Sequence, residues 1–324
     1  MMPVKFCCAL LIAFVCETAA ATPVWIDTDV SIGSPIREVD DAYALILAFH
    51  SPEIRVAGLS TTYGNAPLGQ TTHVARDLVR RFGQAAALAV NDVFPGAGSA
   101  AELGHPNSAS DALAAALEKQ KLTYVALGPL TNLATFLRLH PSEARRIRRI
   151  IFVGGQAPGT SLAFGPSGSF HIHDANVFKD PAATAAVLRS NIPLTLIPIT
   201  TSSRLLVDAM DLRELEGGGP AGNYLARRSK VWLWFWKNFV GTKGGPIFDA
   251  LAVTAATSPE LLSLEKRSAQ MDQAGNLVVT SRLTSSARPL RYCTGFASGT
   301  KRFVMRRLQG RPREGEAPAE PFGR

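Results

Sequence analysis

The chain has 324 residues, of which 46% are hydrophobic and 19% charged, and its 34 Lys and Arg against 26 Asp and Glu give a formal net charge of +8. The apolar share excludes an intrinsically disordered chain, and the length permits one large α/β domain. The positive excess is modest for this length and gives no argument for a nucleic-acid partner. No apolar run reaches the roughly 18 residues that a membrane span needs.

The first 21 residues have the pattern of a secretory signal peptide. Lys5 precedes an apolar run, Phe6–Cys16, and small residues close the segment at position 21. This pattern predicts a secreted or periplasmic protein that does not contact the membrane after cleavage of residues 1–21. A lipoprotein anchored at Cys16 and a buried N-terminal helix are alternative interpretations. Three of the four cysteines fall in this segment, so the mature chain would keep only Cys293 and form no internal disulfide.

The other end of the chain has a different composition. Residues 310–324 are rich in Pro, Gly and Glu and almost devoid of large apolar side chains, which predicts a disordered tail. Neither a repeat nor a linker interrupts residues 22–309. We therefore predict a single domain over that range.

Short apolar runs alternate with helical patterns through this domain. The alternation predicts an α/β fold, with an open, mostly parallel sheet, helices on both faces and a Rossmann-like core. In such sheets the loops that follow the strands hold the ligand site. The predicted strands are Val24–Ile26, Ile54–Leu59, Leu88–Val90, Tyr124–Leu127, Ile150–Val153 and Pro193–Pro198, and predicted helices begin at Asp40, Thr71, Thr131, Pro181 and Asp249.

Four aspartates surround the first predicted strand-to-helix loop, WIDTDVSIGSPIREVDDAYAL. Asp27 and Asp29 end the strand, and Asp40 and Asp41 begin the helix, where the helix dipole tolerates negative charge. Four carboxylates on one loop repel one another unless a hard cation lies between them, and Ca²⁺ prefers oxygen ligands. We predict a Ca²⁺ site here. The alternative is that Asp40 caps the helix and the other three are solvated.

This acidic loop and several later segments resemble, in the same order, the inosine-uridine-preferring nucleoside hydrolase family. Each segment alone is a weak signal, but the shared order is specific, and the resemblance extends from about Val24 to about Phe303. It implies a nucleoside hydrolase-like fold. The matching segments are DTD and DDAYAL in the first loop, TTYGN at 61–65, ALGPLTNLA at 126–134, FVGG at 152–155, NVFKDPAA at 176–183 and FDALAV at 248–253.

The resemblance also implies how a metal is held. Ca²⁺ would be bound by Asp29, Asp41, Asp249 and the backbone carbonyl of Leu127. Asp29 would also act as the general base on a metal-bound water.

The same resemblance implies the substrate contacts. Asp40 and Asn65 would bind ribose hydroxyls, and Asn176 matches a sugar-contacting position. Asp174 stands where the family usually has Glu. The implied reaction is hydrolysis of the N-glycosidic bond of a small-molecule nucleoside or other N-riboside, which passes through an oxocarbenium-like state. The implied assembly is a homodimer or homotetramer.

Three departures from the family pattern bear on function. Phe248 stands where many members have a histidine that is thought to protonate the departing base, so base preference stays open. The loop Val30–Val39 is longer than usual but keeps Gly33. The central loop has no obvious Asn for a further ribose contact, and carries His171 and His173 instead; these could donate a proton, bind a second metal or simply be a polar loop face.

An aromatic pattern late in the chain predicts a helix face. Trp232, Phe235, Trp236 and Phe239 recur at helical spacing, which is typical of core packing or an oligomer contact rather than a base-stacking wall. Trp234 falls outside that face and is the better candidate for the rim of a pocket.

Two other functions compete with a ribonucleoside hydrolase. One is a nucleoside- or sugar-binding protein of the same fold without turnover, which Phe248 and the missing Asn favour and the intact Asp29, Asp41 and Asp249 oppose. The other is a metal-dependent phosphatase, because D-x-D after a first strand also opens phosphotransferases that use an Asp nucleophile. The pair Asp40 and Asp41 and the late Asp249 disfavour it.

Overall fold

The computed structural model describes most of the predicted domain. Its described residues are 20–33, 37–156, 162–164, 168, 170–172, 174–282 and 287–312. Residues 1–19 of the predicted signal segment, residues 313–324 of the predicted tail and His173 lie outside them. Within the described ranges, no helix is both long and apolar enough to cross a bilayer. Cys293 is a buried free thiol.

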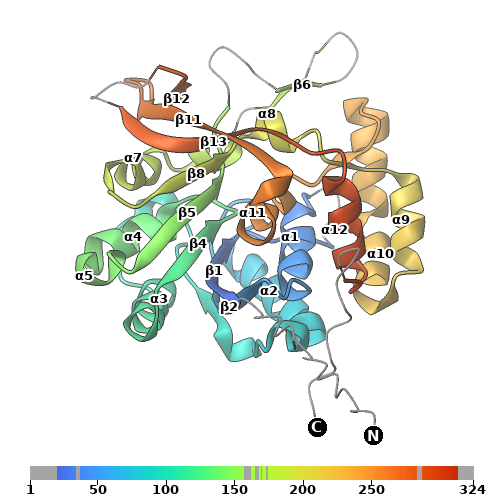
Figure 1. The fold of residues 1–324 in the computed structure, drawn as a ribbon, viewed down its shortest axis with the longest axis horizontal. Coiled ribbons are helices and arrows are strands. Elements are labelled where there is room, and N and C mark those ends of the chain that lie inside the picture. Colours follow the sequence, from blue (N-terminus) through green and yellow to red (C-terminus); the bar gives the residue numbers. More distant parts are fainter. Residues whose placement is uncertain are drawn as a thin grey trace, which may run out of the picture.

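The described part of the chain is organised around a nine-stranded sheet in the order β12-β11-β13-β8-β5-β4-β1-β2-β3 (Figure 1). Neighbouring strands are parallel from β13 to β3, whereas β11 pairs antiparallel with β12 and β13. The predicted open, mostly parallel sheet is therefore confirmed. The strands are β1 (Thr22–Thr28), β2 (Ile54–Thr61), β3 (Val93–Pro95), β4 (Leu122–Ala126), β5 (Ile147–Val153), β8 (Leu194–Ile197), β11 (Leu262–Met271), β12 (Leu277–Thr280) and β13 (Arg288–Phe296).

Two short pairs of strands lie outside this sheet, and both are antiparallel. One joins β6 (Leu162–Phe164) to β7 (Phe170–Ile172), and the other joins β9 (Leu206–Val207) to β10 (Gly245–Pro246).

Successive residues of the central strands point into two separate hydrophobic cores. In β1, Val24 and Ile26 belong to one cluster, and Trp25 belongs to the other. This alternation is the period of a strand buried on both faces, and it explains the near-continuous apolar runs in the sequence. Helices cover each core, as Figure 1 shows for α1 and α11 on one side of the sheet and α3, α4 and α7 on the other.

The helices begin close to the predicted positions. The first core is covered by α1 (Asp40–Phe49), α2 (Leu68–Phe82), α9 (Ala209–Glu216), α10 (Gly219–Phe235), α11 (Ala250–Thr257) and α12 (Thr300–Leu308). The second is covered by α3 (Ser108–Lys119), α4 (Thr131–Leu139), α5 (Pro141–Ala144) and α7 (Pro181–Arg189). Shorter helical segments are α6 (Ala175–Lys179), α8 (Ile199–Ser202), a π-helical turn at Trp236–Val240, and 3-10 turns at Gly83–Ala86, Val90–Asp92, Ala100–Glu102 and Pro259–Leu261.

The strand predicted at Leu88–Val90 is wrong, and the strand in this region lies a few residues later, at Val93–Pro95. Val90–Asp92 instead form a 3-10 turn, and the Asp92 carboxylate accepts a hydrogen bond from the Ala89 backbone N–H at 2.7 Å. The Asp92 side chain therefore stabilises a turn just before the strand begins. Asn and Asp side chains form hydrogen bonds with nearby backbone groups, and these bonds compete with strand pairing.

The strand order reverses between β1 and β4. After β1 the chain adds β2 and β3 on one side, and then returns to add β4, β5 and β8 on the other. Open α/β sheets bind ligands in the crevice outside the carboxyl ends of the strands at such a point. Asp29 directly follows β1 and Leu127 directly follows β4, and the Leu127 N–H donates to the Asp27 carbonyl at 2.8 Å. The topology thus brings the acidic first loop to residue 127.

Candidate active site

A cavity of about 190 Å³ lies at this crevice. Its walls come from segments that follow β1, β2, β4, β5 and β8, together with the end of α10 and the start of α11. The polar residues that line it are Glu38, Asp40, Asn65, Asp174, Asn176 and Asp249, and the apolar residues are Leu127, Val153, Ala175, Ile199, Trp236 and Phe248. Six of the residues predicted for metal or substrate binding therefore meet in one cavity.

Three carboxylates form the tightest acidic group near this cavity. Oxygens of Asp40, Asp41 and Asp249 lie within 4.8 Å of one another, and all three side chains are buried. Asp40 and Asp41 begin α1, and Asp249 immediately precedes α11, so the positive ends of two helix dipoles face the group. α1 begins without a side-chain cap hydrogen bond, so the alternative role of Asp40 as a helix cap is wrong.

Burial and mutual repulsion raise the pKa values of this group. Desolvation is the largest cause for Asp40 and for Asp249, and repulsion from the neighbouring carboxylates adds to it, so both pKa values lie well above the ordinary range. The Oδ1 atom of Asp40 is buried without a hydrogen-bond partner in the described part of the chain. A cation beside the group would offset the repulsion and give the unpartnered Asp40 oxygen a positive neighbour.

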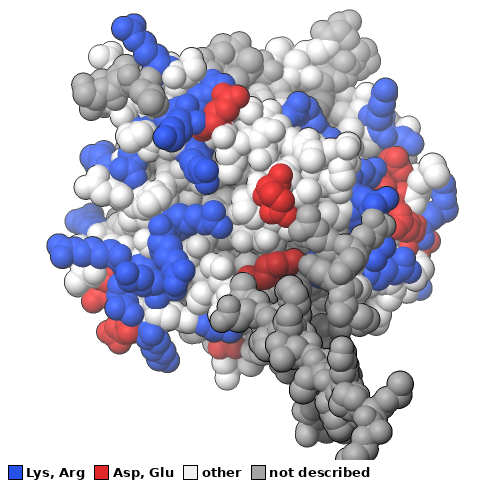
Figure 2. Space-filling model, in the orientation of Figure 1, with Lys and Arg blue, Asp and Glu red and all other residues white. Residues whose placement is uncertain are grey.

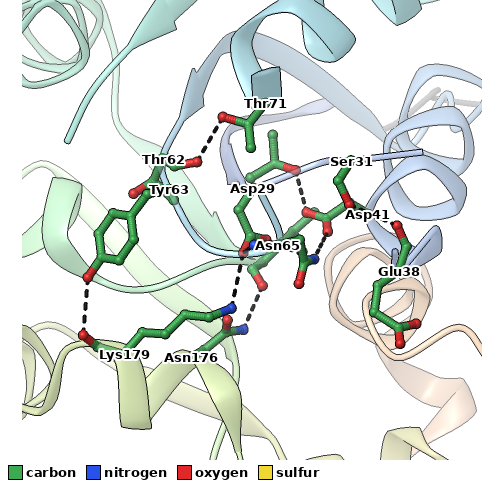
Figure 3. A network of polar contacts seen from close by, with 12 residues as sticks. Asp29, Ser31, Glu38, Asp41, Thr62, Tyr63, Asn65, Thr71, Asn176 and Lys179 are labelled. Atoms are coloured by element: carbon green, nitrogen blue, oxygen red, sulfur yellow. Dashed lines mark hydrogen bonds and ion pairs between the residues drawn. The ribbon is translucent and has the colours of Figure 1, made fainter. Parts of the chain in front are cut away.

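Asn65 links Asp29 to the carboxylate group (Figure 3). Its backbone N–H donates to Asp29 Oδ2 at 2.7 Å, and its side-chain amide donates to Asp41 Oδ2 at 3.0 Å and to Asp29 Oδ1 at 3.4 Å. The Thr28 hydroxyl also donates to Asp41. Asp29 is thus held beside the group of three carboxylates rather than within it.

Lys179 is a residue of the site that the sequence reasoning did not identify. Its Nζ lies 3.8 Å from Asp29 Oδ2, as Figure 3 shows, and its side chain is only 25% exposed. Burial and repulsion from Asp41 raise the pKa of Asp29 well above its ordinary range, and the Lys179 ammonium offsets only part of that rise. Lys179 lies at the end of α6, within the segment NVFKDPAA that resembles the family. That segment was the sequence signal from which Lys179 could have been identified.

Asp174 and Asn176 organise the opposite wall. The Asp174 carboxylate caps α6 by accepting from the backbone N–H groups of Asn176 at 3.0 Å and Val177 at 3.4 Å, and burial raises its pKa to about 6. The Asn176 amide donates to the carbonyls of Leu127 at 2.7 Å and Val153 at 2.9 Å. It therefore ties the ends of β4 and β5 together and fixes the Leu127 carbonyl at the cavity wall.

The prediction that four aspartates converge at the first loop is wrong for Asp27. Its carboxylate accepts hydrogen bonds from the Ser60 hydroxyl at 2.6 Å and the Asn132 amide at 2.8 Å, and it does not line the cavity. Asp27 is still within β1, so its side chain faces the core beneath α4, whereas Asp29 lies past the end of the strand. Asp27 is a structural acceptor that joins β1, β2 and α4.

The aromatic segment differs from its predicted face. Trp232 and Trp236 are each 2% exposed, but Trp236 lines the cavity, while Phe239 is 55% exposed. Trp234 is 59% exposed and does not line the cavity, so its prediction as a rim residue is wrong. The π-helical turn at Trp236–Val240 adds a residue to the turn and shifts the face after Trp236. His171 is exposed on β7 and lines no part of this cavity.

The described acidic group fits a hard divalent cation. Its donor atoms are carboxylate oxygens, and the described cavity lining contains no histidine or cysteine. Such a donor set suits Ca²⁺ or a similar ion better than Zn²⁺. On the face shown in Figure 2, Lys and Arg are spread widely and Asp and Glu occur at a few places, whereas the carboxylates of the site are buried. The fold and the site together are those of an α/β protein with a buried acidic cluster that could hold a metal ion.

Comparison with known proteins identifies the family. A model of the inosine-uridine preferring nucleoside hydrolases matches residues 24–298, and the chain belongs to that family. The family resemblance seen in the sequence is thus confirmed, and the chain is an enzyme of the nucleosidase class.

Individual relatives agree with this membership. Uridine nucleosidase 1 of Arabidopsis thaliana is 26% identical over 282 residues, which cover 77% of this chain and 78% of that protein. A pyrimidine-specific ribonucleoside hydrolase of Shigella flexneri is 30% identical over 152 residues, which cover 47% of this chain and 46% of that protein.

Solved structures share the fold. A plant nucleoside hydrolase has a TM-score of 0.75 at 22% identity, covering 89% of this chain and 99% of its own. A purine-preferring ribonucleoside hydrolase from Gardnerella vaginalis has a TM-score of 0.74 at 22% identity, covering 89% and 98%. At this level of identity the likeness establishes the fold.

Gly64 provides a sharp test of the position of Asp29. Its φ of +156° is disfavoured for residues with side chains, and a Cβ there would overlap the Asp29 carboxylate. We expect Gly64→Ala to displace Asp29 and to lower kcat/KM for nucleoside hydrolysis at least about 100-fold, because small misplacements of reacting groups are costly. Gly69→Ala is the control, since a Cβ at Gly69 in α2 meets no atom within 4 Å. Equal activities of the two variants would contradict this placement of Asp29.

The raised pKa values predict how the stability of the metal-free protein depends on pH. Burial raises the pKa of Asp27 and of Asp174 from 3.8 to about 6. Between those values the folded protein binds more protons than the unfolded chain, so the free energy of unfolding falls as pH rises from about 4 to about 6. Thermal melts in EDTA across this range should show a falling Tm. A Tm that rises steadily over the same range would be the opposite result.

Proposed function

We propose that the protein is a Ca²⁺-dependent hydrolase that cleaves the N-glycosidic bond of ribonucleosides to ribose and a free base. The observation that supports this most is the meeting of Asp40, Asp41 and Asp249, from distant parts of the chain, beside a cavity that Asp40, Asp249, Asn65 and Asn176 line. The carboxylates and amides of the lining suit a ligand rich in hydroxyl groups, and its apolar and aromatic side chains suit a planar base.

The residues divide into two roles in this proposal. Asp29, Asp41, Asp249 and the Leu127 carbonyl would hold the Ca²⁺, which would supply positive charge that orients sugar hydroxyls and makes a neighbouring water easier to deprotonate. Asp40, Asn65, Asp174 and Asn176 would bind the ribose.

Asp29 is proposed to act as the general base. The attacking water gives a proton to the Asp29 carboxylate, its oxygen bonds to C1′ of the ribose, and the electron pair of the breaking C1′–N bond leaves with the base. Asn65 and Lys179 hold Asp29 in place, by hydrogen bonds of 2.7 and 3.4 Å from Asn65 and an ion pair of 3.8 Å to Lys179. The buried carboxylates around the sugar stabilise the positive charge that develops on its ring.

Replacement of Asp29 tests this role. Asp29→Asn should lower kcat for inosine, uridine and 4-nitrophenyl riboside at least about 100-fold, since general-base catalysis contributes factors of this size. Released ribose is the quantity to measure. Asp111→Asn changes an exposed aspartate of α3 and serves as the matched control, with wild-type activity expected.

Other results would favour the competing functions. Wild-type protein that binds nucleosides tightly without releasing ribose would be a binding protein of the same fold. Release of phosphate from nucleotides without release of sugar from nucleosides would point to a phosphatase.

We further propose that residues 1–21 direct secretion or export to the periplasm and are then removed, and that the mature protein is a homodimer or homotetramer. N-terminal sequencing of the exported protein should begin at Thr22. Light scattering of the purified protein measures the assembly, and a monomer would contradict that part of the proposal.

A further inference from the structure

The cavity lining contains two chemically different sets of side chains. Asp40, Asn65 and Asp249 contribute carboxylates and an amide, whereas Ile199, Trp236 and Phe248 are apolar or aromatic. The rings of Trp236 and Phe248 lie 6.2 Å apart at an interplanar angle of 59°. The ribose of a nucleoside is polar and its base is planar, so the aromatic side chains suit the base.

Glu38 is a polar side chain of the lining that bonds to an aromatic residue and also lies close enough to Asp40 and Asp41 for their charges to interact. Its Oε2 accepts a hydrogen bond from the Trp232 indole N–H at 2.8 Å, and Trp232 lies one helical turn before Trp236. Glu38 also lines the cavity, and Figure 3 shows it apart from Asp29 and Asn176. The roles proposed above for metal and ribose binding do not use this carboxyl group.

We propose that Glu38 determines specificity for the base by accepting a hydrogen bond from an N–H of the nucleobase. This inference rests on the proposed nucleosidase function and names the side chain that would select a base carrying a ring N–H over one that lacks it. A carboxyl oxygen accepts this hydrogen bond whether the group is ionised or neutral. A site built around such a contact rejects an analogue that lacks the N–H, because the buried acceptor then stays unpaired.

The hydrogen bond from Trp232 positions Glu38 for the proposed contact with the base. The Trp232 N–H donates to one oxygen of the Glu38 carboxyl group, so that group is oriented before the base arrives. Trp232 is itself 2% exposed and packed in the core, which holds the donor in place.

The test compares uridine with 3-methyluridine, which lacks the N3–H. The wild type should prefer uridine, and Glu38→Ala should reduce that preference at least about tenfold, chiefly through KM. Glu38→Gln keeps the shape and the acceptor for Trp232 but presents an NH₂ donor to the base, and it should reduce the preference similarly. 4-Nitrophenyl riboside has no N–H, so its kcat/KM should fall by a smaller factor than that of uridine in both variants. Glu118→Gln on α3, an exposed position, is the matched control.

Equilibrium binding separates this proposal from the proposed function. Uridine binding is followed by tryptophan fluorescence in Asp29→Asn and in Asp29→Asn/Glu38→Ala, neither of which needs turnover. Selective loss of uridine binding over 3-methyluridine binding supports the role of Glu38 even if no nucleoside is hydrolysed. Equal losses for both ligands would show that Glu38 only supports the fold around Trp232, and unchanged uridine preference would show that it does not face the base. Either result overturns the proposal, while hydrolysis of 4-nitrophenyl riboside by the wild type would leave the nucleosidase function standing.

Discussion

Repulsion among buried carboxylates is the constraint on which this structure depends. Four aspartates at the site are each at most 5% exposed: Asp29, Asp40, Asp41 and Asp249. In the described part of the chain, the Lys179 ammonium pairs with one of them, with its Nζ 3.8 Å from Asp29 Oδ2. Removing these carboxylates from water costs free energy, and contacts with apolar side chains do not offset that cost. Buried charges are therefore expected where they are paired or bind a metal. A divalent cation is the partner that such an arrangement fits, and membership of the nucleoside hydrolase family agrees with it.

The sheet topology brings these acids together. Asp29, Asp41 and Asp249 are separated by up to 220 residues in sequence, but β1 and β4 are neighbours at the switch point, and α1 and α11 begin beside them. The cavity therefore has rigid elements behind its polar wall, which keeps the carboxylates and the Leu127 carbonyl in place. The aromatic part of the lining comes from Trp236, which directly follows α10, and from Phe248, which precedes Asp249 at the start of α11.

The sequence predicts the sheet and the polar wall, since apolar runs and motif order are local signals. Asp40, Asn65, Asp174, Asn176, Leu127 and Asp249 line the cavity as these signals indicate. The direction of a side chain is a tertiary property, and for that reason Asp27 was grouped with the site although it binds Ser60 and Asn132. Glu38 and Lys179 were missed because a single charged residue in a loop or at a helix end has no periodicity. Trp234 was preferred to Trp236 because helical spacing assigns Trp236 to the core face, and spacing alone does not show that this buried face reaches the cavity.

Calorimetric titration of the chelator-treated protein with Ca²⁺ tests the central claim most directly. The account predicts binding of a single ion per chain, a rise in Tm on saturation, and loss of that binding in Asp249→Asn, with wild-type binding in the exposed control Asp111→Asn. Absence of Ca²⁺ binding by the folded wild type, or unchanged binding in Asp249→Asn, would contradict it.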